Sequence, residues 1–252
     1  MTKAQVRTQF GANAAAYATS KVHAQGASLA RLVELVQPQP QWQVLDVATA
    51  AGHTAFVFAP HVAQVTATDI TPEMLTVAAR LAAEKNIQNV TFREADAEAL
   101  PFADATFDLI TCRIAPHHFP DIARFVGESA RVLRAGGILA VVDNIVPEGA
   151  AGVFVNEFEK LRDPSHYHCL SLAEWLDMLR NAGFTLRHQE TALKAMTFND
   201  WAARMKVATA TVDELRARLL NAAGPAADFL QPQATDDDIT FYLTEAILIG
   251  GV

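Results

Sequence analysis

Three aspartates follow apolar segments of the chain, and their positions suggest where a ligand binds. Asp46 ends the apolar run that opens VLDVATAAGHTA (44–55), Asp69 lies at the end of QVTATDI, and Asp96 follows NVTFRE. At the second of these positions, a carboxylate can accept both hydrogen bonds of a ribose 2′,3′-diol. At the third, it can accept a hydrogen bond from the exocyclic amine of adenine. The alternatives are a helix N-terminal role for Asp69 and a turn role for Asp96.

The loop that follows Asp46 limits the kind of ligand. A dinucleotide pyrophosphate favours the pattern G-x-G-x-x-G, but Ala48, Ala50 and His53 occupy those positions, and the loop glycine is Gly52. An alanine at positive φ costs about 1 kcal/mol, and its methyl group blocks close approach. The loop therefore disfavours NAD and FAD. It suits a cofactor without phosphate, such as S-adenosylmethionine, whose amino-acid tail can bind backbone groups.

Histidines form the second chemically active group. His117 and His118 lie in APHHFPD, and His166 and His168 lie in RDPSHYH. An imidazole titrates near neutral pH, so we expect one of the first pair, with His118 preferred, to act as a base or to bind substrate. His166 is a second candidate for the same work. The alternative is a capping or packing role, and without a carboxylate or thiol pattern we predict no metal site.

Other side chains have weaker indications. Asp143 ends the fifth apolar segment and is expected to line the same site. Trp201 and Met205, spaced i, i+4, suit either an apolar lid over a substrate or an ordinary core.

The elements that must position these residues alternate along the first half of the chain. We expect strands at 43–48, 64–70, 89–94, 107–114 and 138–146, and helices at 21–36, 53–60, 71–85 and 120–137. This alternation predicts an α/β fold with a doubly wound, mostly parallel sheet. Ligands of such sheets bind at the carboxyl ends of the strands, where the aspartates lie.

The second half predicts a cover for that edge. A helix at 171–184 begins with the capping box Ser171/Glu174, a strand follows at 185–192, and the last strand is expected at 240–251. Two short helices within 198–220 would form a lid inserted between the final two strands. We expect one domain, with an N-terminal helical cover (1–36), a cofactor-binding core (37–150) and substrate-side helices with the final strands (151–252).

Composition excludes several classes of protein. The 252 residues carry a formal net charge of −8 and no basic block, which argues against nucleic acid as a partner. No apolar run has the roughly 20 residues of a membrane span, and the first residues lack the apolar core of a signal peptide. The two cysteines, Cys112 and Cys169, show no metal spacing. We expect a cytoplasmic enzyme.

The motifs VLDVATAAGHTA, ATDITPEML, FREADAEALPF, FDLITCRIAPHHF and RVLRAGG resemble, in their order, those of class I S-adenosylmethionine-dependent methyltransferases. The ubiquinone/menaquinone-biosynthesis type and its small-molecule relatives look most similar. The resemblance implies a seven-stranded, Rossmann-like methyltransferase fold. The chain departs from the usual D-x-G-x-G-x-G in having alanines at the first two glycine positions, which bears on affinity for the cofactor.

The resemblance also implies roles for individual residues. Asp69 would bind the ribose, Asp96 the adenine amine, and Arg113 would lie beside the transferred methyl group. The other cofactor contacts would be made by Asp46, Ala48, Thr49, Ala50, Gly52, Ile70, Met74 and Ala97.

The N-terminal segment FGANAAAY resembles a stretch that folds over the cofactor in these enzymes. It implies that Tyr17 closes the pocket, and His23 would reach the same region. An ordinary packed amphipathic helix is the alternative.

These observations lead to one main hypothesis and two alternatives. We expect S-adenosylmethionine-dependent methyl transfer to a small organic acceptor, at carbon, oxygen or nitrogen. The alternatives are a protein that binds S-adenosylmethionine without methyl transfer and a nicotinamide oxidoreductase. The oligomeric state stays open, a homodimer included.

Overall fold

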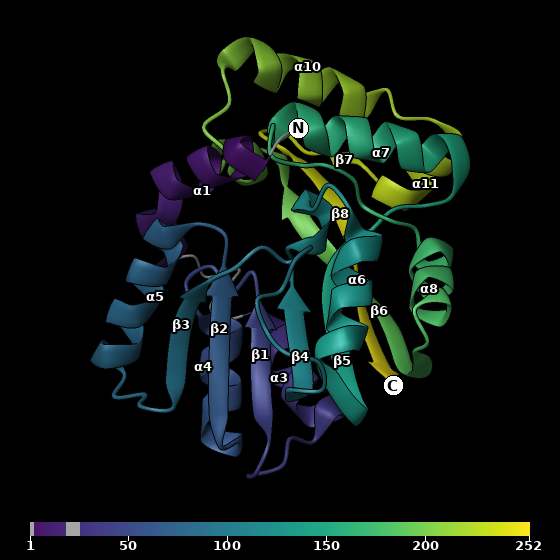
Figure 1. Ribbon diagram of the computed structural model, residues 1–252. Helices are drawn as coiled ribbons and strands as arrows, with labels where there is room; N and C mark the ends of the chain where they lie inside the picture. The colour runs from purple at the N-terminus through teal and green to yellow at the C-terminus, as the bar shows by residue number, and fades with distance from the viewer. Residues whose placement is uncertain (1–2, 19–25) are drawn as a thin grey trace.

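A computed structural model describes residues 3–18 and 26–252 of the chain (Figure 1). In these ranges the strands form one sheet with the order β3-β2-β1-β4-β5-β8-β6. The two-residue β7 (Gln233–Ala234) pairs with β8 off this path. The other strands are β1 (Gln43–Val47), β2 (Gln64–Asp69), β3 (Val90–Glu94), β4 (Phe107–Arg113), β5 (Leu133–Ile145), β6 (Thr185–Thr197) and β8 (Ile239–Gly251).

Strands β1 to β5 are parallel, and the chain reverses its direction of winding between β1 and β4. This reversal is the switch point at which a doubly wound sheet leaves a crevice. The predicted α/β class and doubly wound sheet are therefore confirmed.

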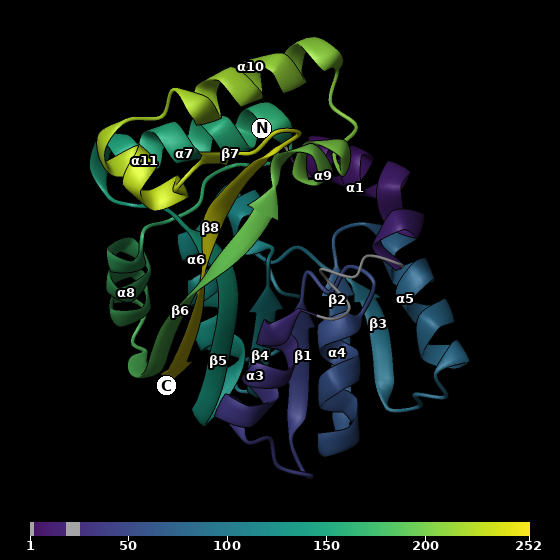
Figure 2. The ribbon, with the colours of Figure 1, turned by 180° about the vertical axis from the view of Figure 1, so that it is seen from behind.

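Side-chain alternation along the strands gives the sheet two apolar faces. In β1, Val44 packs into one core, whereas Leu45 and Val47 pack into the other. Helices α3 (Ala27–Val36), α4 (His53–Phe58) and α5 (Pro72–Glu84) contribute to the first core, and α6 (Ile122–Val132) and α8 (Leu172–Asn181) to the second. Figure 2 shows α3 and α4 in front of the sheet, and Figure 1 shows α6 and α8 on the opposite side.

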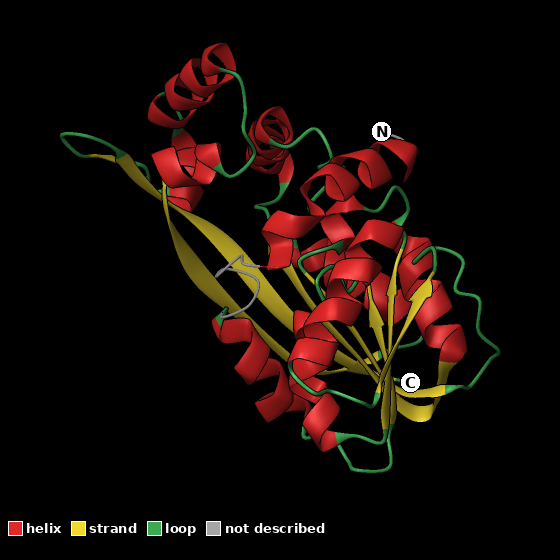
Figure 3. Ribbon diagram, turned by 90° about the vertical axis from the view of Figure 1, so that its left-hand side faces the viewer, coloured by secondary structure: helices red, strands yellow, loops and turns green. Residues whose placement is uncertain are grey.

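The antiparallel pair β6 and β8 continues past the end of its neighbour β5. Strand β8 pairs with β5 only between Thr244 and Gly251, but with β6 from Thr240 to Gly251. The two strands therefore extend beyond the carboxyl edge of the parallel strands, as Figure 3 shows from the side. Their extension carries the lid.

The lid has a hydrophobic core of its own. It contains α7 (Gly149–Arg162), α9 (Phe198–Ala203), α10 (Thr209–Leu220) and α11 (Gly224–Leu230), which pack together with the extended part of β8. The rings of Phe158 and Trp201 are stacked at 4.9 Å, and Phe241 of β8 meets Trp201 edge-on at 5.3 Å. The predicted helices within 198–220 are present, and α7 and α11 complete the lid.

Several predicted boundaries were wrong. The strand expected at 138–146 begins at Leu133. The helix expected at 120–137 ends at Val132, because Leu133 already pairs with Phe107 and is buried in the sheet core. The strand expected at 185–192 continues to Thr197 along β8. The predicted helix at 21–36 is present from Ala27, with Gly26 outside the helix as its N-cap, and residues 21–25 lie outside the described residues.

Helix α1 (Lys3–Ala18) lies beside α5, next to the carboxyl ends of the strands (Figure 1). Ion pairs connect it to the region after β3: Lys3 to Asp96 and Glu98, and Arg7 to Glu94. Among the described residues, no helix has both the length and the apolar character that crossing a membrane requires.

Replacing Phe241 tests how strongly the lid core contributes to stability. Phe241 is fully buried against Phe158 and Trp201, so we expect Phe241→Ala to lower the free energy of unfolding by about 3–5 kcal/mol. Urea denaturation followed by circular dichroism measures this loss. Val153→Ala is the control: Val153 lies on α7 with 58% of its surface exposed, and we expect a change within about 0.5 kcal/mol. Equal effects of the two changes would mean that the lid core contributes little.

Candidate active site

A cavity of about 310 Å³ lies at the carboxyl ends of the parallel strands. Its wall includes residues that follow β1, β2, β3 and β4, together with side chains of α1, β6 and the lid. This volume is at the lower end of the range for small-molecule and cofactor sites. Most of the residues predicted from the sequence lie in this wall: Ala48, Thr49, Ala50, Asp69, Ile70, Met74, Asp96, Ala97, Arg113, His117, His118, Trp201 and Met205.

The loop between β1 and α4 has the backbone conformation of a glycine-rich turn. Ala48, Ala50 and Gly52 have φ values of 53°, 47° and 86°. The alanines thus adopt the left-handed conformation for which glycine is usual, at the expected cost in backbone strain. At Gly52 a side chain is excluded, because a Cβ would meet the Phe56 ring at 2.5 Å.

The Asp46 carboxylate, in β1, stabilises this loop through hydrogen bonds. It accepts hydrogen bonds from the hydroxyl groups of Thr49 (2.5 Å) and Thr111 (2.7 Å). Burial raises the pKa of Asp46 to about 6, although these hydrogen bonds oppose the shift. Asp46 is 1% exposed and, like Gly52, is not among the residues of the cavity wall. Its placement suits a positioning role and not the direct cofactor contact that the resemblance implied.

Asp69 connects the loop to the next strand. One carboxylate oxygen accepts a hydrogen bond from the Ala50 amide and the other from the Thr71 amide, both at 2.9 Å. Burial raises the pKa of Asp69, and the backbone hydrogen bonds oppose this shift. Because each oxygen can accept more than one hydrogen bond, the carboxylate can still accept from a diol in the cavity.

At the next strand end, α1 covers the carboxylates. Asp96 accepts from the Glu98 amide at 3.0 Å, and the Lys3 ammonium lies 2.5 Å from Asp96 and 2.6 Å from Glu98. Burial lowers the pKa of Lys3, but the hydrogen bonds and charges of the two acids outweigh it and raise the pKa. Sequence reasoning did not find Lys3, because its contact joins segments far apart in the chain.

Arg113 leaves the end of β4 into the cavity wall. Its Nε donates to the hydroxyl of Ser28, 3.1 Å away on α3, and both side chains are buried. Burial lowers the pKa of Arg113, and the charges of Glu245 and Asp46 oppose this shift. Ser28 was not predicted as a partner.

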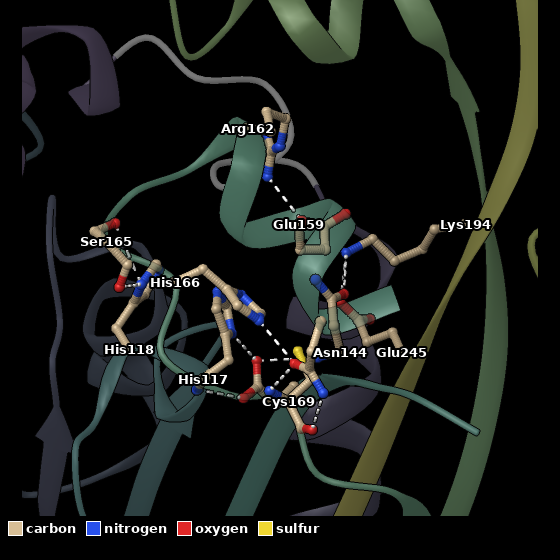
Figure 4. A network of polar contacts seen from close by, with 12 residues as sticks. His117, His118, Asn144, Glu159, Arg162, Ser165, His166, Cys169, Lys194 and Glu245 are labelled. Atoms are coloured by element: carbon tan, nitrogen blue, oxygen red, sulfur yellow. Dashed lines mark hydrogen bonds and ion pairs between the residues drawn. The ribbon is translucent and has the colours of Figure 1, made fainter. Parts of the chain in front are cut away.

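His117 forms a buried ion pair with Asp143. Asp143 accepts from the His117 amide at 2.8 Å and from Nδ1 of the ring at 2.5 Å (Figure 4). Burial lowers the pKa of His117, but the charge and hydrogen bond of Asp143 outweigh it, so the pKa is raised. Asp143 was expected to line the cavity, but it lies behind His117 and is not part of the cavity wall.

His118 differs from His117 in its hydrogen-bond partner and in the direction of its pKa shift. Its Nδ1 lies 2.8 Å from the carbonyl oxygen of Ser165, an acceptor, so Nδ1 carries the proton and Nε2 the lone pair. Burial, followed by the charge of His117, lowers the pKa of His118 to about 4. His118 is thus a neutral imidazole on the cavity wall.

The two histidine segments predicted from the sequence do meet. The His117 carbonyl accepts from the amides of Tyr167 (2.8 Å) and His168 (3.0 Å), and the rings of His117 and His166 are 5.6 Å apart.

His166, however, is buried away from the cavity wall and donates from Nε2 to the side-chain oxygen of Asn156 at 2.8 Å. The same oxygen accepts from the Cys169 amide, which fixes it as the acceptor. Burial, then the charges of His117 and His118, lowers the pKa of His166 to about 2. The geometry thus supports a structural role for His166.

Two further predictions fall where the structure gives no side-chain description. Tyr17 belongs to α1, but its side chain lies outside the described residues, as does the whole of His23. Within the described ranges, no group of three or more His, Cys, Asp or Glu side chains is arranged to hold a metal ion. Besides Lys3, four cations of the cavity wall were not predicted: Arg162, Lys194, Arg204 and Lys206.

Known proteins share this architecture. Residues 45–141 match the methyltransferase domain family. The uncharacterized methyltransferase YcgJ of Bacillus subtilis is 36% identical over 248 residues, which cover 97% of this chain and 98% of the relative. The demethylmenaquinone methyltransferase of Thermus thermophilus is 37% identical over 126 residues, which cover 49% of this chain and 57% of the relative.

The solved structures agree. The crystal structure of the YcgJ protein from Bacillus subtilis superimposes with a TM-score of 0.86 at 34% identity, over 89% of this chain and 97% of the other. Fold, motifs and full-length similarity lead to one conclusion: the chain belongs to the S-adenosylmethionine-dependent methyltransferase family.

Proposed function

We propose that the cavity binds S-adenosylmethionine and that the chain transfers its methyl group to a small organic acceptor. The observation that carries this proposal is the position of Asp69 and Asp96, after neighbouring strands and in the wall of one cavity. From these positions Asp69 would bind the ribose and Asp96 the adenine amine of one adenosine. The positions of Ile70 and Met74 in the same wall support apolar contacts with the adenine.

The loop after β1 fits a cofactor without phosphate. Ala48, Thr49 and Ala50 line the cavity where the amino-acid tail of the cofactor would lie, whereas the two alanine methyl groups would obstruct a pyrophosphate. We assign Asp46 to holding this loop. Bound S-adenosylmethionine would supply a methyl group on a positively charged sulfur. A nicotinamide cofactor is disfavoured by the same loop.

His118 is the base that this site offers. With Nδ1–H donated to Ser165, the Nε2 lone pair can accept a proton from the acceptor as the methyl group is transferred. Most of the rate enhancement in such a displacement comes from alignment of acceptor, methyl and sulfur, to which the fixed loop and Arg113 would contribute. The atom that is methylated, whether carbon, oxygen or nitrogen, depends on an acceptor still to be identified.

Titration calorimetry with S-adenosylmethionine, S-adenosylhomocysteine and NAD in parallel tests the cofactor. We expect both sulfur compounds to bind and NAD to give no measurable heat. Binding of NAD alone would overturn the proposal. Cofactor binding without turnover on a broad panel of acceptors would favour a protein that binds S-adenosylmethionine without methyl transfer.

Asp69→Ala tests the ribose contact. We expect its affinity for S-adenosylhomocysteine to fall more than tenfold, because the diol loses its acceptor and the loop loses the hydrogen bond to Ala50. Glu84→Ala, a change of the same charge at an exposed position of α5, is the control and should bind as the wild type does. Unchanged affinity of Asp69→Ala would exclude the ribose assignment.

His118→Ala tests the base. We expect a loss of turnover of about 10²–10⁴-fold on the acceptor that the panel identifies, while affinity for S-adenosylhomocysteine stays within twofold. The matched control is His61→Ala, at an exposed position outside the cavity wall. A parallel loss of cofactor affinity would mean that His118 has a structural role.

The protonation state of His118 can be measured without an acceptor. Its pKa of about 4 lies below the ordinary value, so the ring should stay neutral as the pH falls from 8 to about 5 and gain its proton only near pH 4. The ring proton resonance, assigned by its absence in His118→Ala, should therefore not shift across that range. A titration near pH 6.5 would contradict the buried, neutral base.

A further inference from the structure

The wall of the cavity changes charge from one end of the sheet to the other. On the side of β2 and β3 it contains the carboxylates of Asp69, Asp96 and Glu98, the last two paired with Lys3. On the side of the lid it contains one carboxylate, Asp163, and four cations in a chain whose net charge is −8: Arg162, Lys194, Arg204 and Lys206. The carboxylates can accept hydrogen bonds from an adenosine. An adenosine has no negative group that the four cations of the lid side would bind.

Arg162 is held rigidly in this basic wall. Its guanidinium stacks on the Trp201 ring at 4.5 Å and pairs with Glu159 at 3.0 Å. The Nε atom is buried and has no hydrogen-bond partner in the described part of the chain. A buried donor without an acceptor destabilises the folded state, so a bound anion would satisfy a group that the protein leaves unpaired.

Arg204 and Lys206 follow α9, near Arg162. The polar contact of Arg204 is a weak one, from Nη2 to the Met196 sulfur at 3.6 Å. In the ranges that the structure describes, neither side chain forms an ion pair with a carboxylate. Two cations on a cavity wall without an ion-pair partner among the described residues raise the local concentration of an anionic ligand.

Lys194 comes from the extension of β6 and points back toward β5 (Figure 4). Its Nζ lies 3.1 Å from the side-chain oxygen of Asn144 and 3.4 Å from Glu245. Figure 4 shows Arg162 and Lys194 on the same side of the histidine cluster. His118, Arg162 and Lys194 all contribute to the wall of the same cavity.

The same wall offers apolar surface between the charges. Trp201, Met196, Met205 and Leu243 all line the cavity beneath the lid. A ligand that fits this part has an apolar or aromatic body and at least one negative group.

We propose that the methyl acceptor is an anion, with a carboxylate or phosphate group bound by Arg162, Arg204 and Lys206 and an apolar body against Met196 and Met205. This inference rests on the proposed function, because it assumes that the cofactor occupies the acidic side. Arginine binds a carboxylate or a phosphate through paired N–H donors. The wall therefore favours a negatively charged group of either kind.

Calorimetry on the protein saturated with S-adenosylhomocysteine tests this inference. The probes are 2-naphthoate, 2-naphthyl phosphate and, as the neutral analogue, 2-naphthamide. We expect at least one anion to bind ten or more times more tightly than the amide, and the stronger of the two identifies the preferred group. The double change Arg204→Ala/Lys206→Ala should lower that affinity at least tenfold and leave affinity for S-adenosylhomocysteine within twofold.

Arg180→Ala is the matched control for the loss of positive charge. Arg180 lies on α8, pairs with Asp177 and is outside the cavity wall, so its loss should leave the binding of both anions unchanged. Arg204 and Lys206 are exposed, so we expect the double variant to fold as the wild type does, and a thermal melt checks this.

Three outcomes overturn the inference. The first is anion binding that is no tighter than that of the amide, or absent. The second is an equal loss in the Arg180→Ala control. The third is a loss of S-adenosylhomocysteine affinity in the double variant, which would assign the cations to the cofactor's carboxylate. Failure of the wild type to bind S-adenosylhomocysteine, measured first, would refute the proposed function instead.

Discussion

The turn between β1 and α4 is the constraint on which the site depends. Its backbone must be left-handed at Ala48 and Ala50, where alanine is strained, and two buried carboxylates hold it there. Asp46 binds it from the loop's own strand and Asp69 from the neighbouring strand. The cost of burying these groups is visible in their raised pKa values. The sheet core excludes water from these two carboxylates, and the carboxylates in turn fix the loop that forms part of the cavity wall.

A second buried charge organises the other side of the site. The contact with Asp143 raises the pKa of His117, and the positive charge of a protonated His117 lowers the pKa values of His118 and His166. The three rings therefore differ in role although their sequence context is similar. Hydrogen-bond partners make the difference: a carboxylate for His117, a backbone carbonyl for His118 and an amide oxygen for His166.

The parts predictable from the sequence are those with a local signal. The carboxyl ends of β1 to β4 were predicted to within a residue, and the Thr71–Pro72 helix start and the Ser171/Glu174 capping box were predicted and are present. These features were predictable because each depends on residues that are neighbours in the chain. The partner of Lys3 and the convergence of Arg162 with Lys194 were not predicted. These contacts join residues that are far apart in the chain, and no periodic pattern in the sequence indicates them. Helix α7 was missed because its small residues GAAG give no apolar stripe.

The lid core has a consequence for how such proteins diversify. Phe158, Trp201 and Phe241 pack among themselves, and they are joined to the sheet mainly through the extended strands β6 and β8. Substitutions that reshape the lid face of the cavity therefore need not disturb the packing beneath the β1–α4 turn. Selection can alter one without compromising the other. A single chain of this design is able to retain one reagent over evolutionary time while exchanging the compounds on which that reagent is used.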